Sequence, residues 1–388
     1  MKGYMKGYIK KRKGKHGTSY LVRVDRGPDP VTGKRRQPSK TFRTRKAAEV
    51  ELAQWLYEIE RGTTLDGSRL TLGEYLTHWL DSYGQHNLRP TTYRSYEQLT
   101  RVHILPALGS IPLQKLQPAQ LQAFYSRKLE GGRGDGKAGG LSARTVRYLY
   151  AILREVLQHA IKMQLLARNV AEATEPPRAV RSQVPSWDID EVQRFLPLTN
   201  IDGYAPIWLV ALTTGMHRGE LLGLRRQDVD LMRGVLHIRQ NLVEIGSKLR
   251  FQEPKTKKGR RAVALSPACV TALREHRTAQ LEQHLWLGSS WRDFDLVFTT
   301  SDGGPITPRN LIRRFKALTR QAELPPIAFH ALRHSHTTLL LRQGHHPKKV
   351  SDRLGHASIA ITLDTYSHVL PDMQREVADG IDRALFAT

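Results

Sequence analysis

Four side chains near the C-terminal end of this 388-residue sequence have types and spacing that suit chemistry at a phosphate. His330 and Arg333 stand three residues apart, so on a helix they project from one face. Nitrogen donors aimed at one point bind a phosphate. His356 directly follows Gly355, a residue expected to end a helix and leave the histidine on a tight corner. Tyr366 follows ten residues later.

The order of these residues resembles the C-terminal signature of the tyrosine recombinase (phage integrase) family. That signature is His-x-x-Arg, then Leu-Gly-His, then Thr-Tyr-Ser-His, and it occupies residues 327–368 here. A lone His-x-x-Arg is usually a solvated helix face, whereas the ordered combination is far more specific. The resemblance implies that Tyr366 attacks a DNA phosphodiester and forms a 3′-phosphotyrosyl bond. It also implies that Arg333 is the second catalytic arginine, with His330 and His356 as its partner histidines.

A lysine that protonates the leaving 5′-oxygen is the next part that the resemblance implies. The segment Glu253–Arg261 (EPKTKKGRR) is expected to be a hairpin. Lys-Thr before a strand is the form the family uses, which favours Lys255. Lys257 is the alternative, because hairpin length varies. A basic hairpin that is merely solvated is the non-catalytic interpretation.

The first catalytic arginine of the family is missing from its expected place. The family pattern is Thr-Gly-x-Arg-x-x-Glu, but residues 214–220 are Thr-Gly-Met-His-Arg-Gly-Glu. His217 therefore stands at the arginine position, and Arg218 comes one residue late, about 100° away on a helix. We expect Glu220 to be a structural partner of a basic group.

Three interpretations of His217 stay open. His217 impairs catalysis while DNA binding is kept, or Arg218 reaches the site through local distortion. In the third, a protonated His217 binds the phosphate itself, which is poorer because an unperturbed histidine is mostly neutral at pH 7. We favour the first.

The charge of the chain predicts a polyanionic partner. Lys and Arg total 61 against 36 Asp and Glu, a formal net charge of +25, and nucleic acid is the default partner for such a surplus. A membrane-surface protein is the alternative, but the longest uncharged apolar run, residues 204–216, is too short to span a bilayer. One cysteine, Cys269, and an N-terminus without a signal-peptide pattern predict the bacterial cytoplasm, in association with the nucleoid.

Three domains are expected to position these residues, in a fold that is mainly α with small β-sheets. Residues 1–66 would form a small three-stranded sheet plus a helix, residues 67–180 a helical domain, and residues 181–388 a mixed α+β catalytic domain with a C-terminal tail helix. Val377, Ile381, Leu385 and Phe386 recur at helical spacing in that tail, which predicts that it docks on a neighbouring catalytic domain.

Residues 1–66 carry much of the excess positive charge, because the first 50 residues hold 16 Lys and Arg against 3 Asp and Glu. Ser19–Val24 alternates as a strand, residues 35–42 can pair with it, and a helix follows over residues 45–61. This unit resembles the arm-type DNA-binding domain of transposon and phage integrases, whose sheet can lie in a major groove. A basic tail that adds only non-specific affinity is the alternative. The contact candidates are Tyr20, Arg23, Arg35 and Arg36.

Residues 67–180 resemble the core-binding (SAM-like) domain of the family at two helix starts. These are RPTTYRSY from Arg89 and LSARTVRYLY from Leu141. In the family, such helix N-termini and their side chains contact phosphates. An ordinary solvated helix start is the alternative for any single residue. The candidates are Thr91, Thr92, Arg144 and Arg147.

The resemblance implies a site-specific DNA recombinase that integrates or excises mobile DNA through a Holliday junction. Its partners would be double-stranded DNA at core and arm sites, three further copies in a homotetramer, and accessory DNA-bending or directionality proteins. No cofactor is expected, and the histidines show no metal-ligand spacing. Two alternatives remain: a catalytically defective DNA-binding relative, kept open by His217, and a type IB topoisomerase.

Overall fold

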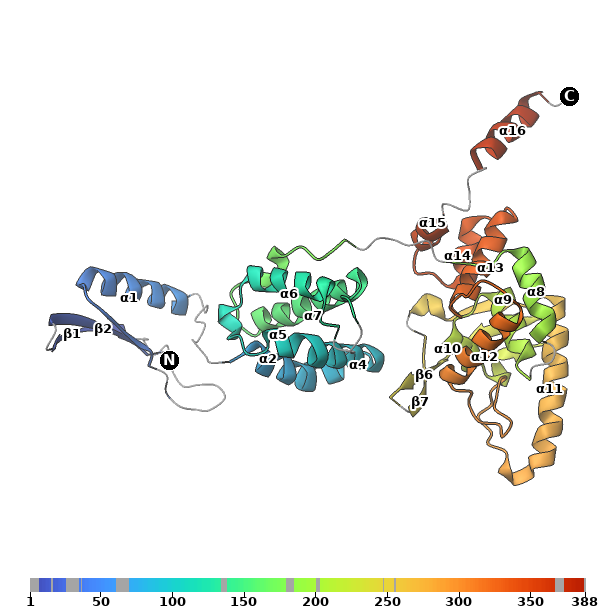
Figure 1. The fold of residues 1–388 in the computed structure, drawn as a ribbon, viewed down its shortest axis with the longest axis horizontal. Helices are drawn as coiled ribbons and strands as arrows, with labels where there is room; N and C mark the ends of the chain where they lie inside the picture. Colours follow the sequence, from blue (N-terminus) through green and yellow to red (C-terminus); the bar gives the residue numbers. More distant parts are fainter. Residues whose placement is uncertain are drawn as a thin grey trace. The chain divides into compact units, whose positions relative to one another are not determined.

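Two compact units make up the chain, Met1–Arg181 and Ser182–Thr388, and each is described by itself (Figure 1). The computed structural model describes residues 7–14, 17–25, 35, 37–60, 70–133, 138–178, 185–199, 203–246, 248–254, 256–366 and 373–386. The predicted fold class is confirmed: the chain is mainly helical and carries small antiparallel sheets. No helix within these described ranges is long and apolar enough to cross a membrane.

The first unit begins with a three-stranded antiparallel sheet of order β1-β2-β3, followed by one helix. Its elements are β1 Gly7–Gly14, β2 Gly17–Val24, β3 Ser39–Phe42 and α1 Arg45–Glu60. Val22 and Val24 are buried on the face that α1 covers: a Cβ built on Gly7, the partner of Val24, would lie 2.5 Å from Leu52 of α1. Successive side chains of a strand point to opposite faces, so the residues next to these in sequence lie on the other face of the sheet.

The rest of the first unit is helical and packs around one apolar core. Its longest helix is α7, whose buried residues recur every three or four positions, as expected for a helix with one apolar face. Ser142 caps α7 by accepting the backbone N–H of Thr145 at 3.2 Å. The α-helices are α2 Leu72–Trp79, α3 Gln85–Asn87, α4 Pro90–Leu99, α5 Leu105–Leu108, α6 Pro118–Glu130 and α7 Ala143–Lys162.

The second unit places helices around a larger core and two small sheets (Figure 1). Its helices are α8 Ile189–Thr199, α9 Ala205–Thr214, α10 Arg218–Leu222, α11 Pro267–Leu287, α12 Pro308–Gln321, α13 Ala331–Arg342, α14 Pro347–Leu354, α15 Ile359–Tyr366 and α16 Met373–Phe386. Its strands are β4 Val229–Asp230, β5 Val235–Ile238, β6 Asn241–Ile245, β7 Lys248–Gln252 and β8 Arg261–Ala264.

The strand pairing corrects one expectation from the sequence. We expected residues 253–261 to be a hairpin, but β7 pairs with β6, whereas β8 pairs with β5 in a separate sheet of order β4-β5-β8. The described part of this segment is therefore a connection between two sheets, with a 3₁₀ turn at Lys257–Gly259.

Two left-handed glycines end the helices that meet at the candidate site. Gly215 ends α9 with φ 65°, and Gly355 ends α14 with φ 73°, as predicted for Gly355. A Cβ at Gly215 would lie 2.7 Å from both His336 and Leu354, so the turn also needs the space. These turns bring the carbonyl ends of both helices close to α13.

Candidate active site

Arg333 is the buried cation at the centre of the candidate site. It lies in the first turn of α13 and is 4% exposed. Its Nη1 donates to Gly215 O at 2.7 Å and its Nη2 to Leu354 O at 2.8 Å. Both carbonyls belong to helix ends, where the helix dipole leaves partial negative charge. Burial lowers the pKa of Arg333 to about 10, so it stays charged at neutral pH and can offer its other N–H groups to an anion.

Another arginine, Arg353, donates hydrogen bonds to backbone carbonyls close to the site. Its Nη2 donates to Thr213 O at 2.8 Å and to Ala264 O at 3.1 Å, and its Nε donates to His336 Nε2 at 3.3 Å. His336 Nδ1 lies 2.8 Å from Leu212 O and therefore carries the ring proton. Burial lowers the pKa of His336 to about 3, so this histidine is a neutral structural bridge.

Glu220 and Arg261 form a buried ion pair beside this framework, as expected for Glu220. Both guanidinium Nη atoms lie 3.0 Å from the carboxylate oxygens, and the side chains are 6% and 7% exposed. Glu220 also accepts the backbone N–H of His217 at 2.9 Å. Arg261 Nε donates to Arg353 O at 2.8 Å. The pair therefore joins the start of α10 to the end of α14.

Glu220→Gln should lower the free energy of unfolding by about 1.5–3 kcal/mol, because hydrogen bonds to charged groups contribute about that much. Burial raises the pKa of Glu220, but the hydrogen bond and charge of Arg261 outweigh it and the pKa is lowered. Such a carboxylate stabilises the fold above its unfolded pKa, and the contribution is lost as pH falls through the folded pKa. Denaturant unfolding should show the full difference above about pH 5 and a smaller one in acid. The exposed Glu275→Gln is the control, and an equal effect of both changes would contradict the prediction.

His217 precedes α10 with extended backbone, φ −68° and ψ 150°. The expected helical rotation between positions 217 and 218 is therefore wrong, because position 217 lies outside the helix. The exposed ring of His217 stacks on His330, with ring centroids 5.1 Å apart and planes 6° apart. Arg218 is half-buried, and the charge of Glu244 on β6 partly offsets the lowering of its pKa by burial. Of positions 217 and 218, it is therefore position 217 whose side chain contacts His330.

His217 offers little positive charge to a phosphate. Surrounding protein replaces part of the water around the ring, and together with the Arg333 charge this lowers the pKa of His217 to about 4. The ring is therefore neutral at pH 7, which does not favour the interpretation that a protonated His217 binds the phosphate.

His330 and Arg333 differ in exposure although they stand three residues apart. His330 directly precedes α13 and is exposed, whereas Arg333 points inward. Surrounding protein replaces part of the water around the His330 ring, and this partial desolvation, followed by the charge of Arg333, lowers the pKa of His330. His330 therefore faces solvent at the mouth of the site, above the buried guanidinium.

Tyr366 ends α15 and is 4% exposed, packed against Leu341, Val350 and Leu354. Burial raises the pKa of the Tyr366 hydroxyl, although Thr337 and Arg333 act in the opposite direction. The hydroxyl is therefore protonated at neutral pH. A nucleophilic Tyr366 must lose its proton as it reacts.

The sequence reasoning missed His334. Its Nδ1 is hydrogen-bonded to the Tyr366 hydroxyl, and its ring lies 5.2 Å from that of His330 at 88° between planes. The signal available in the sequence was the spacing of four from His330, which places the two rings one helical turn apart.

His356 lies on the corner after Gly355, as predicted. Its Nδ1 is 2.8 Å from Thr362 Oγ1. Burial, followed by the charges of Arg333 and Arg261, lowers the pKa of His356 to about 4. His356 is therefore a neutral hydrogen-bonding group beside Arg333.

The predicted general acid, Lys255, lies outside the described residues, and so does the side chain of Lys257. The next residue, Lys258, donates from Nζ to Ala357 O at 2.8 Å. This contact brings the 253–261 segment to the corner that holds His356. The choice between Lys255 and Lys257 stays a prediction.

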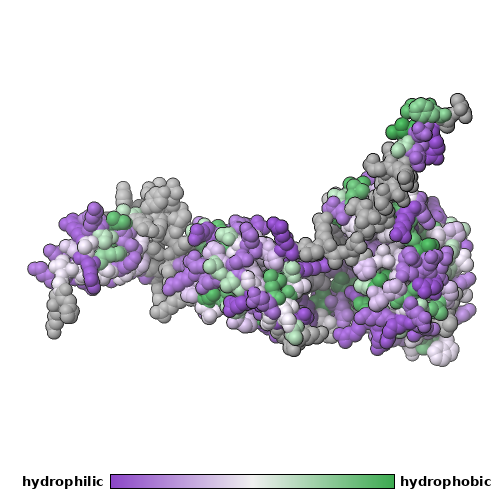
Figure 2. Space-filling view, turned by 45° about the horizontal axis from the view of Figure 1, so that its top comes forward, coloured by the Kyte–Doolittle hydropathy of each residue, from purple (hydrophilic) through white to green (hydrophobic). Residues whose placement is uncertain are grey.

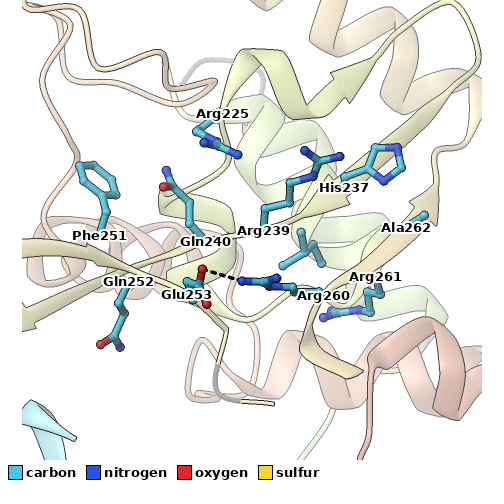
Figure 3. Close-up of a pocket in the computed structure, with 11 residues that line it drawn as sticks. Arg225, His237, Arg239, Gln240, Phe251, Gln252, Glu253, Arg260, Arg261 and Ala262 are labelled. Atoms are coloured by element: carbon cyan, nitrogen blue, oxygen red, sulfur yellow. Dashed lines mark ion pairs between the residues drawn. The ribbon is translucent and has the colours of Figure 1, made fainter. Parts of the chain in front are cut away.

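A basic cavity of about 680 Å³ adjoins the site through Arg261 (Figure 3). Asp228 is 3% exposed and lies 2.6 Å from Arg225 Nε and 3.4 Å from Arg239 Nε. Both arginines line the cavity, and both contacts with Asp228 use Nε. Arg260 pairs with Glu253 at 2.5 Å. The wall is thus lined by arginines that one buried carboxylate helps to orient.

The structure separates two of the arm candidates. Arg23 pairs with Tyr8 and Ser39, on the sheet face opposite α1, whereas Tyr20 belongs with Val22 and Val24 to the face that α1 covers. Arg35 is exposed and forms an ion pair with Asp25 at 2.5 Å. Arg36 lies outside the described residues.

The core-binding candidates lie at the starts of two helices. Thr91 and Thr92 are in the first turn of α4, and Arg144 and Arg147 are in the first two turns of α7. Arg144 and Arg147 line one groove together with Ser95 of α4. The two motifs therefore contribute to one groove. Across the described residues no group of three or more His, Cys, Asp or Glu could hold a metal ion.

Three segments of the chain match described protein families. Residues 188–373 match the phage integrase family, residues 71–129 the phage integrase N-terminal SAM-like domain, and residues 8–59 an arm DNA-binding domain. The matches fall in the order that the sequence predicted.

Similar proteins cover nearly the whole chain. A tyrosine recombinase XerC-like protein of Caldanaerobacter subterraneus subsp. tengcongensis is 28% identical over 94% of this chain and 95% of its own length. The ICEBs1 integrase of Bacillus subtilis is 26% identical over 94% of this chain and 97% of its own length.

Two solved structures share the fold. The Tn1549 transposon integrase, in complex with a circular intermediate DNA, has a TM-score of 0.66 at 20% identity and covers 80% of this chain and 99% of that one. A lambda integrase dimer bound to a COC′ core site has a TM-score of 0.54 at 16% identity, covering 92% and 93%.

Proposed function

Because this chain belongs to the phage integrase family of tyrosine recombinases, its activity class is site-specific DNA strand transfer in mobile elements, and we propose that Tyr366 carries that activity. The observation that supports this most is the placement of the Tyr366 hydroxyl beside His334, within the electrostatic reach of the buried Arg333. We further propose three domains, residues 1–66, 67–180 and 181–388, working on nucleoid DNA in a bacterial cytoplasm.

The proposed reaction divides the work among groups with different chemistry. Arg333 holds the charge of the pentacoordinate phosphorane, because a guanidinium stays ionised and binds oxygens in pairs. His330 and His356 donate hydrogen bonds to the same phosphate. The Tyr366 oxygen attacks phosphorus, and Lys255, or Lys257, protonates the leaving 5′-oxygen. His217 stands where the family places its first catalytic arginine, so charge stabilisation is incomplete.

A suicide DNA substrate, nicked near the crossover point, tests the proposal. The expected product is a covalent protein–DNA band that survives denaturing electrophoresis. Trypsin should release a nucleotide-bearing peptide that begins at Leu354 and contains Tyr366. An adduct on any other residue would contradict the proposal.

The alternatives give different results in related assays. A type IB topoisomerase would relax a supercoiled plasmid that lacks a specific site. A defective DNA-binding relative would shift the specific DNA on a native gel and give no covalent band.

DNA contacts by the basic cavity provide a separate prediction. Arg239→Gln should weaken DNA binding uniformly across sequences and reduce the slope of log affinity against log salt by about 1, because each neutralised phosphate releases counterions. Titrations at several salt concentrations measure this slope. Arg233, in the turn between β4 and β5 and outside the cavity, gives the matched control Arg233→Gln. Equal slopes for Arg239→Gln and the native chain would rule the contact out.

The tail helix α16 is proposed to join protomers into a tetramer on DNA. Ile381, Leu385 and Phe386 are 57%, 68% and 73% exposed, and Figure 2 shows hydrophobic residues gathered on one side of this helix. Fully burying one such side chain contributes about 1.5–3 kcal/mol. Deleting residues 372–388 should therefore reduce tetramers on DNA by about tenfold or more, as counted by mass photometry. Asp382→Ser is the control, and unchanged assembly after the deletion would exclude this role. Accessory DNA-bending or directionality proteins complete the proposed assembly.

A further inference from the structure

We propose that His334 is the general base of the reaction, with its Nδ1 accepting the proton of the Tyr366 hydroxyl as that oxygen attacks phosphorus. The inference rests on the proposed function of Tyr366 and assigns one more catalytic residue to the same site.

The geometry of the site points to His334 among its described histidines. His334 Nδ1 is hydrogen-bonded to the Tyr366 hydroxyl, and α13 fixes its position one turn after His330. The ring of His330 stacks on His217 at the exposed mouth of the site. His356 Nδ1 is occupied by Thr362 Oγ1.

His336 is excluded by its own partners. Its Nδ1 faces Leu212 O and its Nε2 faces Arg353, so both ring nitrogens are held by structural contacts. His334 is therefore the histidine in contact with the atom that must lose a proton.

The proton balance is complete. The Tyr366 O–H bond breaks and its proton moves to His334 Nδ1, while the Oη–P bond forms and the bond from phosphorus to the 5′-oxygen breaks. The 5′-oxygen takes its proton from the proposed lysine. During rejoining, the 5′-hydroxyl returns its proton to the same lysine as its oxygen attacks phosphorus, and His334 returns its proton to the departing Tyr366 oxygen. This scheme requires the His334 tautomer that carries its proton on Nε2.

The charge state of the free protein fits a proton acceptor. Burial, then His330 and Arg333, lower the pKa of His334 to about 4, so the ring is neutral at neutral pH. A bound DNA phosphate adds negative charge nearby, which favours the protonated ring and moves its pKa toward the operating pH.

Replacement of Tyr366 by a more acidic difluorotyrosine distinguishes a base from a merely positioning residue. His334→Ala should slow formation of the covalent band by about 10²-fold or more, in the range of general acid–base catalysis. Difluorotyrosine at position 366 should restore most of that rate, because its phenol ionises without help. The same replacement should not rescue His330→Ala, the comparison variant. All rates are measured in the native and the His217→Arg chains.

A DNA substrate with a different leaving group also distinguishes a general base from a general acid. A 5′-phosphorothiolate DNA releases a thiolate that needs no proton, so it should bypass a missing general acid and leave the His334→Ala defect in place. Rescue of His334→Ala by this DNA, or no rescue by difluorotyrosine, would overturn the assignment.

A measurement without DNA also tests whether His334 Nδ1 is free to accept a proton. Nitrogen and carbon NMR of labelled histidine in the full chain, assigned with His334→Gln, should report the Nε2–H tautomer for His334. The Nδ1–H tautomer would make His334 a donor and overturn the proposal. Absence of any adduct on Tyr366 would refute the proposed function, whereas an adduct formed at an unchanged rate in His334→Ala would refute only the base.

Discussion

Tyr366→Phe should abolish the covalent protein–DNA product while leaving DNA affinity nearly unchanged. The substitution removes only the attacking oxygen, and the ring keeps its packing against Leu341, Val350 and Leu354. Loss of the buried hydrogen bond to His334 should cost about 1–3 kcal/mol of stability, which the domain can tolerate. Denaturing gels with the nicked substrate measure the adduct, and native gels measure binding.

Tyr83→Phe is the matched control for this experiment. Tyr83 lies in the helical part of the first unit, where its ring lies 4.5 Å from that of His159, and it is 36% exposed. The adduct should persist in this variant. A residual adduct in Tyr366→Phe, at any rate above that of the DNA alone, would show that another nucleophile acts.

His217→Arg should raise the rate of adduct formation by about 10²–10³-fold, the effect of one preorganised charge donor in comparable sites. Position 217 stacks on His330, and its histidine is neutral at pH 7. Arg261 also lies nearby, but its positive charge is paired with the carboxylate of Glu220. In the proposed mechanism, Arg333 is therefore the main cation at the phosphate, and an arginine at 217 would supply the second.

His217→Gln is the uncharged control and should give no increase. Thermal unfolding of each variant checks that the new cation, placed near Arg333, leaves the chain folded. Equal rates of adduct formation for the native and His217→Arg chains would mean that His217 or Arg218 already does the work of the first catalytic arginine. In that case the interpretation of a catalytically impaired protein would be wrong.

The C-terminal signature was predictable because its information is local. His330, Arg333, His356 and Tyr366 fall within 40 residues, and Gly355 marks the helix end that turns His356 into the site. The apolar periodicity of helices such as α7 was visible for the same reason: it repeats every few residues.

The contacts that hold the site together were not predictable, because their partners are far apart in sequence. Arg333 bonds Gly215 across 118 residues, and Arg261 pairs with Glu220 across 41. Nothing local distinguishes Arg261 from the other basic residues around it. The error over residues 253–261 has the same origin, since a strand does not encode which strand it pairs with.

The span from Gly215 to Arg333 also orders events during biosynthesis. A ribosome adds about 5–20 residues per second, so on the order of ten seconds separates the emergence of these two partners. Tyr366 is made later still, near the end of the chain. In the proposed function, the arm and core-binding segments that contact DNA are therefore made while the proposed nucleophile does not yet exist. A nascent chain with this proposed function would therefore be able to bind DNA well before it is able to cut it.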